Sequence, residues 1–225
     1  MTSREPRALV IFDCDGVLVD SERIANGVFA ELITAIGLPT SFEECVATYL
    51  GRSMSSCTSL IEGRLGCPVP DDFVALYYER IYAAFDRGLA AVPGVVAALD
   101  ALESSAAMTC VASSGPHERM RRTLGRTGLM TRFEGRIFSA SEVPRGKPFP
   151  DLLVHAAARL DAKPDRCVVV EDSRAGVLAG RAAGMPVLGY ADLTEPSELE
   201  AAGATVFRSM AELPALVAAA LSGTG

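Results

Sequence analysis

Residues 8–16 read ALVIFDCDG, an apolar run that stops at two aspartates and a glycine. Three more short apolar runs follow, over residues 108–112, 167–170 and 185–189, and longer stretches of helical periodicity separate them. Continuous apolar runs of this kind are typical of strands covered on both faces, as in a parallel sheet with crossover helices. The sequence therefore predicts an α/β fold with helices on both faces of a parallel sheet.

Polar residues follow three of these apolar runs. Asp13, Ser113 and Glu171 each come directly after the last apolar position. In an open α/β sheet, the carboxyl ends of the strands gather at one crevice. We therefore expect these three side chains to lie close together.

The second half of the chain continues the alternation of helices and strands. Its patterns predict helices over residues 116–128, 150–161, 174–184 and 209–221, and strands over residues 136–139, 166–171, 186–190 and 204–207. These elements continue the predicted α/β pattern, and the sequence contains no internal repeat.

A segment of different character separates the first two apolar runs. Residues 21–89 have helical periodicity and no buried-strand run, with one apolar stripe at i, i+3 and i+4 spacing: Phe73, Leu76, Tyr77, Ile81 and Phe85. The pattern predicts an all-helical domain over residues 21–89, inserted into a core domain of residues 1–20 and 90–225. Because the insertion leaves the core after the first strand and returns before the second, we expect it to cover the crevice like a lid.

Composition excludes several classes of partner. The chain has 225 residues, of which 49% are hydrophobic, enough for a full core and an insertion. Its formal net charge is −7, and its only lysines are Lys147 and Lys163. Without a basic patch, nucleic acid and anionic membranes are poor candidate partners.

The N-terminal residues and the cysteines indicate a compartment. Residues 1–8 are polar and charged, and the apolar run over residues 9–12 is far too short for a signal or membrane segment. The six cysteines contain no C-x-x-C pair, which favours reduced structural thiols. We expect a cytoplasmic protein, and a monomer because core and insertion look self-sufficient.

Two pairs of carboxylates follow two of the predicted strands. Asp13 and Asp15 follow the first, and Glu171 and Asp172 follow a later one. An Asp-x-Asp-Gly segment alone is also typical of an ordinary strand-end turn. Two such pairs at one crevice cannot all stay ionised without a cation, which predicts a divalent metal. All-oxygen ligation favours Mg²⁺ over Zn²⁺, since no histidine belongs to the pattern.

Positive charge and hydrogen-bond donors for a phosphate come from two loops. Lys147 lies between Gly146 and Pro148, just before a predicted helix. Ser113, Ser114 and Gly115 precede another predicted helix, whose N-terminus suits an anion. A loop lysine or a strand-end serine is often only a surface feature, so the prediction rests on their combination with the carboxylates.

The order of these motifs resembles that of the haloacid dehalogenase (HAD) superfamily. The segment DCDGVLVDS over residues 13–21, then Ser113, Lys147 and the pair Glu171-Asp172 match its four motifs within about residues 8–190. The helical insertion resembles the small cap of the branch that contains β-phosphoglucomutases and sugar-phosphate phosphatases. The resemblance implies a Rossmann-like core with a cap that closes over the site.

The resemblance also implies catalytic roles. Asp13 would attack phosphorus and become an aspartyl-phosphate, which divides one difficult step into two. Asp15 would protonate the leaving oxygen and later activate water. Ser113 and Lys147 would hold the phosphoryl oxygens, with Lys147 also neutralising Asp13.

The metal ligands follow from the same resemblance. Mg²⁺ would be held by Asp13, by the backbone carbonyl of Asp15 and by Asp172, with Glu171 as a direct or water-bridged ligand. The metal would screen the nucleophile from the phosphate.

Other activities of the superfamily fit less well. Dehalogenases lack an acid at the position of Asp15, and phosphonatases need a cap lysine that residues 21–89 do not contain. β-Phosphoglucomutases use a histidine where residues 21–26 have none, and an arginine where Met54 stands, with Arg52 two positions away. Hydrolysis is therefore favoured over a mutase, which stays open as an alternative.

The substrate class is narrowed by the serine loop and by the insertion. Residues 113–116 with Arg119-Met120 resemble the S-N-G-P…K-M stretch of bacterial 6-phosphogluconate phosphatase-type enzymes. Arg23 and Arg52 are the candidate substrate contacts in the insertion, although either could be a solvated helix charge. Residues 21–90 hold five Arg against nine Asp and Glu, which disfavours a second bound phosphate. The predicted substrate is a small phosphorylated sugar, polyol or sugar acid.

A binding protein built on an inactive enzyme core is the alternative from another class. Loss of the nucleophile is its usual sign. Asp13 and every other required group are present, so an enzyme is favoured.

Overall fold

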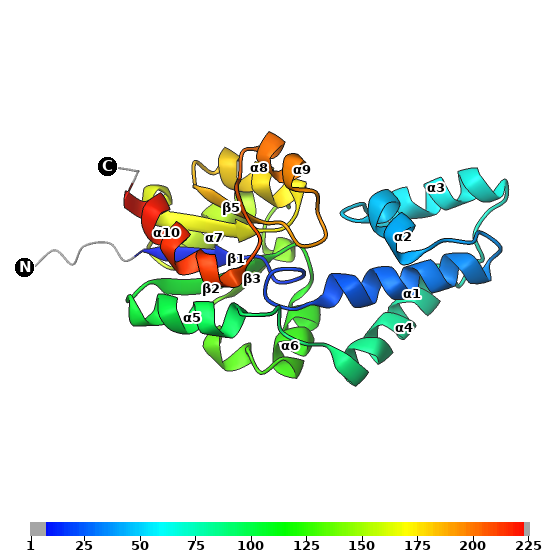
Figure 1. Cartoon of the computed structure of the whole chain (residues 1–225), viewed down its shortest axis with the longest axis horizontal. Coiled ribbons are helices and arrows are strands. Elements are labelled where there is room, and N and C mark those ends of the chain that lie inside the picture. The colour runs from blue at the N-terminus through cyan, green and yellow to red at the C-terminus, as the bar shows by residue number, and fades with distance from the viewer. Residues whose placement is uncertain (1–7, 223–225) are drawn as a thin grey trace, which may run out of the picture. The chain divides into compact units, whose positions relative to one another are not determined.

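The computed structural model describes residues 8–222 and divides the chain into two compact units (Figure 1). The sheet unit comprises the described residues up to Val19 and from Ala91 onward, and the helical unit comprises Asp20–Ala90. Residues 1–7, on which the expectation of a cytoplasmic protein partly rests, lie outside the described part. Within the described part, no helix combines the length and apolar character that a bilayer span requires.

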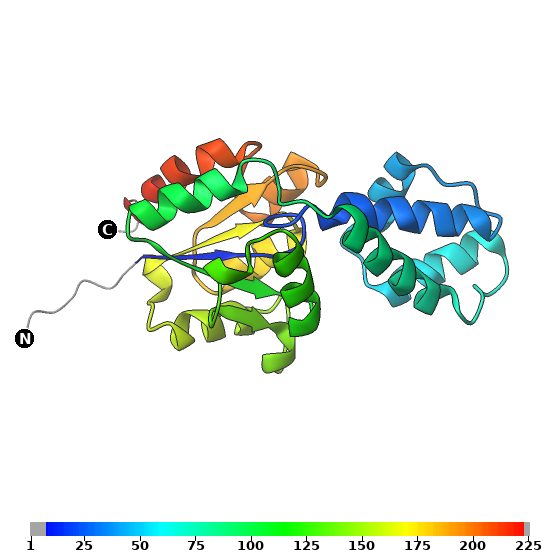
Figure 2. The ribbon, with the colours of Figure 1, turned by 90° about the horizontal axis from the view of Figure 1, so that it is seen from below.

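The sheet unit is built on six parallel strands in the order β3-β2-β1-β4-β5-β6. Their bounds are β1 Leu9–Phe12, β2 Met108–Ser113, β3 Ile137–Ser139, β4 Cys167–Glu171, β5 Val187–Tyr190 and β6 Thr205–Phe207. Figure 2 shows helices on both faces of this sheet, with α5 and α10 on one side and α7 on the other. The predicted α/β class is confirmed.

The central strands are buried because neighbours cover them on every side. All four residues of β1 have no exposed surface, and the strand pairs with β2 and β4 in register, so that Phe12 stands beside Val111 and Val170. Leu9 and Ile11 face the cluster that α7 and α8 cover. The apolar runs predict these strands correctly, and their register brings the residues that follow them to one edge.

The helices of the sheet unit are α5 Val95–Ser104, α6 His117–Arg126, α7 Asp151–Arg159, α8 Arg174–Ala182, α9 Pro196–Ala202 and α10 Leu213–Ser222. The four predicted helices correspond to α6, α7, α8 and α10, of which the last begins after a 3-10 turn at Met210–Glu212. Helices α5 and α9 are not predicted from the sequence. The consecutive apolar residues of α5 obscure its helical period, and α9 has only seven residues.

The helical unit consists of α1 Ser21–Ala35, α2 Phe42–Tyr49, α3 Met54–Leu65 and α4 Phe73–Gly88, without a strand among its described residues. The predicted stripe on α4 is confirmed: Phe73, Ile81 and Phe85 are buried. Phe29 of α1 packs its ring 5.9 Å from that of Phe73 and 5.4 Å from that of Tyr49. These packed aromatic rings give the helical unit a hydrophobic core of its own.

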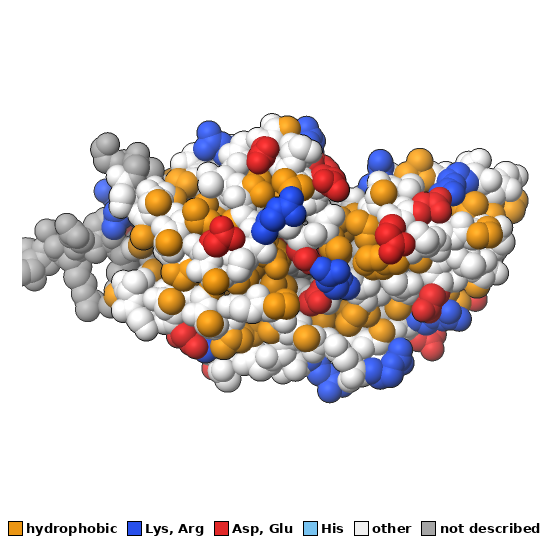
Figure 3. Space-filling model, in the orientation of Figure 1, with side chains coloured by type: hydrophobic (Ala, Val, Ile, Leu, Met, Phe, Trp, Pro, Cys, Tyr) orange, Lys and Arg blue, Asp and Glu red, His pale blue; other side chains and the backbone are white. Residues whose placement is uncertain are grey.

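Charges are mixed on the molecular surface. On the face drawn in Figure 3, acidic and basic side chains are interspersed rather than gathered by sign. The net charge of −7 is therefore not gathered into one acidic patch on this face.

Candidate active site

The loop after β1 carries two of the predicted site residues. Asp13 continues the strand, since its backbone N–H donates to the carbonyl of Val170 over 2.9 Å. The chain then turns at Gly16, which has a φ of +77° and whose N–H donates to the carbonyl of Val19. Only glycine adopts this backbone conformation without strain. The turn leaves the Asp13 side chain buried, at 10% exposure.

Lys147 contacts the carboxyl groups at the ends of both β1 and β4. Its Nζ donates to Asp13 Oδ1 and to Glu171 Oε1, both over 2.6 Å, and its side chain is 4% exposed. Burial raises the pKa of Asp13 to about 7, with the nearby charge of Lys147 opposing that rise. Burial by itself would lower the pKa of Lys147, but the charges of Asp13 and Glu171 outweigh it and raise the pKa. Lys147 is therefore a cation held between two carboxyl groups.

The other oxygen of Glu171 binds the turn that follows β4. Its Oε2 accepts from the N–H groups of Asp172 and Ser173, over 3.0 and 2.8 Å, and from the Ser173 hydroxyl. The carboxylate lies against α8, where a methyl group built on Gly176 would stand 1.7 Å from Oε1. Glu171 is thus fixed on both sides, and it in turn holds Lys147.

Asp172 lies against the loop after β1. A methyl group on Gly16 would stand 2.0 Å from Asp172 Oδ2, so the absence of a side chain at Gly16 lets the carboxylate approach the backbone. The ends of β1 and β4 therefore bring Asp13, Glu171 and Asp172 to one edge of the sheet, as the strand order requires.

The serine loop follows β2 at the same edge. Ser113 is buried, and its Oγ accepts from the Gly115 N–H over 3.2 Å. The Ser139 hydroxyl, at the end of β3, donates to the Gly115 carbonyl over 2.8 Å. A methyl group on Gly115 would stand 3.6 Å from Ser113 Oγ and 3.9 Å from Asp15 Oδ2. Ser113 and Gly115 therefore lie beside Asp15, while the Ser114 side chain is exposed.

Arg119 is a site residue whose contact with Asp15 is not predicted from the sequence. It lies in the first turns of α6, and its Nη2 donates to Asp15 Oδ1 over 3.0 Å. The sequence offers two signals: its place just after the serine loop, at the start of a helix, and the resemblance of Arg119-Met120 to the K-M pair of 6-phosphogluconate phosphatase-type enzymes. Neither signal says that the side chain turns toward Asp15.

Arg23 and Arg52 belong to the helical unit and make contacts inside it. Arg23 Nε lies 3.6 Å from Asp20 Oδ1, with the Arg23 side chain 47% exposed. Arg52 Nε donates to the Thr48 carbonyl over 2.8 Å. Both guanidinium groups keep exposed surface within their unit.

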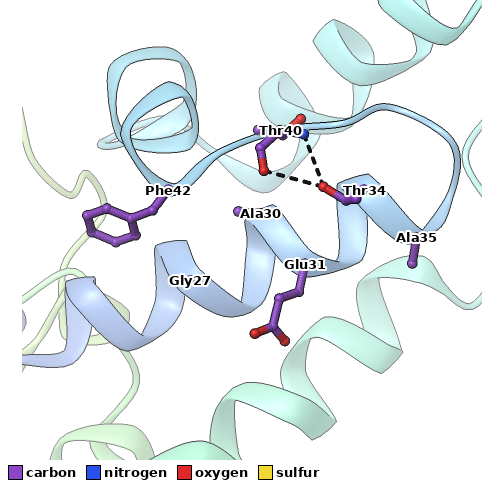
Figure 4. Close-up of a pocket in the computed structure, with 7 residues that line it drawn as sticks. All are labelled: Gly27, Ala30, Glu31, Thr34, Ala35, Thr40 and Phe42. Carbon is purple, nitrogen blue, oxygen red and sulfur yellow. Dashed lines mark hydrogen bonds between the residues drawn. The ribbon is translucent and has the colours of Figure 1, made fainter.

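A pocket of about 510 Å³ opens within the helical unit, between α1 and the loop that follows it (Figure 4). It is lined by Gly27, Ala30, Glu31, Thr34, Ala35, Thr40 and Phe42. Thr34 Oγ1 closes one wall, because it accepts from the Thr40 N–H over 3.0 Å. Its one charged lining group is a carboxylate, so this pocket does not suit a phosphate.

The oxygen donors at the strand ends suit a hard cation. Asp13 and Asp172 supply carboxylates there, whereas His117 and His155 both hydrogen-bond Glu142 instead. Over residues 8–222, no three or more His, Cys, Asp or Glu side chains form a group that could hold a metal on their own. Mg²⁺ fits such a site, since it commonly uses one or two carboxylates and completes its shell with water and substrate oxygens.

Comparisons with known proteins agree with this geometry. A family model described as haloacid dehalogenase-like hydrolase matches residues 8–184. The chain is 29% identical to the 6-phosphogluconate phosphatase of Escherichia coli, over 92% of this chain and 93% of that protein. It is 34% identical to hexitol phosphatase A of Escherichia coli, over 79% of this chain and 80% of the relative.

A solved structure shares the fold across nearly the whole chain. It is a HAD family hydrolase from Deinococcus radiodurans with bound phosphate and sodium, with a TM-score of 0.84 and 33% sequence identity. The match covers 97% of this chain and 98% of the other.

Proposed function

Because the chain belongs to the haloacid dehalogenase-like hydrolases and is a phosphoric monoester hydrolase, we propose that it is a Mg²⁺-dependent phosphatase acting through an aspartyl-phosphate. Its substrate is a small phosphorylated sugar, polyol or sugar acid. The observation that carries the proposal is the buried cluster in which Lys147 binds both Asp13 and Glu171. This cluster supports the proposal because the carboxylate proposed as nucleophile lies 2.6 Å from the cation proposed to bind the phosphate.

In the first step, a carboxylate oxygen of Asp13 forms a bond to phosphorus. The bond from phosphorus to the substrate oxygen breaks, and that oxygen keeps the electron pair and takes the proton of the Asp15 carboxyl group. Lys147 favours the ionised, nucleophilic form of Asp13, since it donates to Asp13 Oδ1. The products are the alcohol and the phosphorylated Asp13.

In the second step, water attacks the phosphorus of the aspartyl-phosphate. Asp15 takes a proton from that water, and the bond between phosphorus and Asp13 breaks. Phosphate leaves, and both carboxyl groups return to their starting states. One group thus serves as acid and then as base, a role that typically contributes about 10²–10⁴-fold in rate.

The phosphoryl oxygens are held by the serine loop and Lys147. Ser113, Ser114 and Gly115 provide hydroxyl and backbone donors just before the N-terminus of α6, where the helix dipole favours an anion. Support for this role comes from the short distances that place Ser113 and Gly115 beside Asp15.

Asp13, Asp172 and the backbone carbonyl of Asp15 would hold Mg²⁺. When bound, the ion would neutralise charge on the nucleophile and the phosphoryl group. Both oxygens of Glu171 already accept hydrogen bonds from the protein, so we assign it a water-bridged contact and the task of orienting Lys147.

The helical unit is proposed as the cap that selects the substrate. Arg23 and Arg52 are its candidate contacts, and its excess of acidic groups favours substrates with one phosphate. Support for the substrate class comes from the names of the two curated relatives, a 6-phosphogluconate phosphatase and a hexitol phosphatase.

Steady-state phosphate release from sugar, polyol and sugar-acid phosphates tests the proposal, with p-nitrophenyl phosphate as a generic substrate. Treatment with EDTA should remove activity, and Mg²⁺ should restore it. Asp13→Asn should abolish turnover while circular dichroism stays unchanged. Release that persists in Asp13→Asn, or a folded protein that releases no phosphate from any substrate, would overturn the proposal. Conversion of β-glucose 1-phosphate to glucose 6-phosphate in place of release would identify a mutase.

A further inference from the structure

Arg119 and Asp15 form an ion pair that the catalytic scheme above does not use. Arg119 Nη2 lies 3.0 Å from Asp15 Oδ1, and the two side chains are 18% and 16% exposed. Because both groups are largely shielded from water, their attraction is stronger than that of an ordinary surface pair. The pair therefore restrains the orientation of the Asp15 carboxylate.

The restraint aims the second oxygen of Asp15 at the serine loop. A methyl group built on Gly115 would stand 3.9 Å from Asp15 Oδ2, 3.6 Å from Ser113 Oγ and 3.6 Å from Arg119 Cδ. Three different segments of the chain thus surround one point. When Asp15 acts as the acid, Oδ1 still accepts from the guanidinium and Oδ2 carries the proton, on the side where the phosphoryl group is proposed to bind.

Helix α6 holds the backbone of Arg119 in place, because the helix is packed against the core. Met120, Thr123 and Leu124, which follow it in the helix, have no exposed surface. The Thr123 hydroxyl donates to the Arg119 carbonyl over 3.0 Å and also lies 3.8 Å from the sulfur of Cys14. The helix therefore contacts two consecutive residues of the loop after β1, Cys14 and Asp15.

We propose that Arg119 is a positioning residue, which holds the Asp15 carboxyl group where it can pass its proton to the leaving oxygen. This inference rests on the proposed function. Proton donation matters most when the leaving oxygen is strongly basic, as in a sugar or polyol, and little when it is a p-nitrophenolate. The contribution of Arg119 should therefore depend on the leaving group.

The test compares kcat/KM for a hexitol phosphate and for p-nitrophenyl phosphate. This ratio covers only the steps up to release of the alcohol, so later hydrolysis of the aspartyl-phosphate does not affect it. Arg119→Met should lower it about 10–100-fold for the hexitol phosphate and less than about threefold for p-nitrophenyl phosphate. For Arg119→Lys, kcat/KM for the hexitol phosphate should lie between the values for Arg119→Met and for the unchanged protein. Arg121→Met, an exposed position on the same helix, is the matched control and should leave both values unchanged.

Equal losses on both substrates would show that Arg119 only supports the fold, and no loss on either would also overturn the inference. Should Arg119→Met fail to fold, Arg119→Gln carries the same comparison. The variant Asp15→Asn distinguishes a failure of the inference about Arg119 from a failure of the proposed function. If Asp15→Asn discriminates between the leaving groups and Arg119→Met does not, only the inference about Arg119 fails. If Asp15→Asn does not discriminate either, the acid role in the proposed function fails with it.

Discussion

Replacing Gly176 by alanine should destabilise this protein, although glycine to alanine in a helix ordinarily stabilises. Gly176 lies in the first turn of α8, and a methyl group there would stand 1.7 Å from Oε1 and 1.9 Å from the carboxyl carbon of Glu171. No carbon and oxygen atoms can approach so closely without a bond. The Glu171 carboxylate, which is buried, must therefore move.

The cost follows from the hydrogen bonds that the carboxylate would lose. Glu171 accepts from Lys147, from the N–H groups of Asp172 and Ser173, and from the Ser173 hydroxyl. A hydrogen bond to a charged group contributes about 1.5–3 kcal/mol, and helix propensity returns at most about 1 kcal/mol. If one or two of these bonds are lost, the free energy of unfolding falls by about 0.5–5 kcal/mol after the gain in helix propensity is subtracted. Displacement of Lys147 should lower kcat by about 10²-fold.

Urea denaturation followed by circular dichroism measures the first effect, and phosphate release the second. Gly125→Ala is the matched control, because a methyl group on this exposed glycine of α6 meets no atom within 4 Å. It should raise the free energy of unfolding by about 0.5–1 kcal/mol and leave kcat unchanged. A Gly176→Ala protein as stable and as active as Gly125→Ala would refute the reasoning.

Two further predictions concern Lys147 and the cysteines. Lys147→Met should lower the free energy of unfolding by about 3–5 kcal/mol, because it leaves the buried carboxyl groups of Asp13 and Glu171 without a counter-charge. The control is Lys163→Met, because Lys163 is the other lysine and is exposed; urea denaturation should show its free energy of unfolding unchanged within about 0.5 kcal/mol. Equal losses of unfolding free energy in both variants would contradict the prediction. In the native protein, 5,5′-dithiobis(2-nitrobenzoate) should label Cys67 alone, since it is exposed while the five other thiols are buried and burial raises the pKa of each. Rapid labelling that persists in Cys67→Ser would show that a buried thiol is reachable.

The sequence by itself determined the strands and the residues that follow them. The runs that became β1 and β4 are apolar at consecutive positions, and only Thr109 interrupts the run that became β2. Such a pattern can be recognised from the local sequence, without knowing which strands pair. Parallel pairing then necessarily brings Asp13, Ser113 and Glu171 to one edge of the sheet. The helical character of residues 21–89 is equally local, since the stripe on α4 follows from spacing alone.

The tertiary structure decided which side chains contact each other within that edge. Arg119 and Asp15 stand 104 residues apart, and their contact depends on how α6 is rotated about its axis. The glycines at positions 16 and 176 look like ordinary turn and helix residues until Asp172 and Glu171 are seen packed against them. Hydrophobic periodicity reports burial along one segment, whereas these contacts depend on the packing of segments distant in sequence, which only the folded chain specifies.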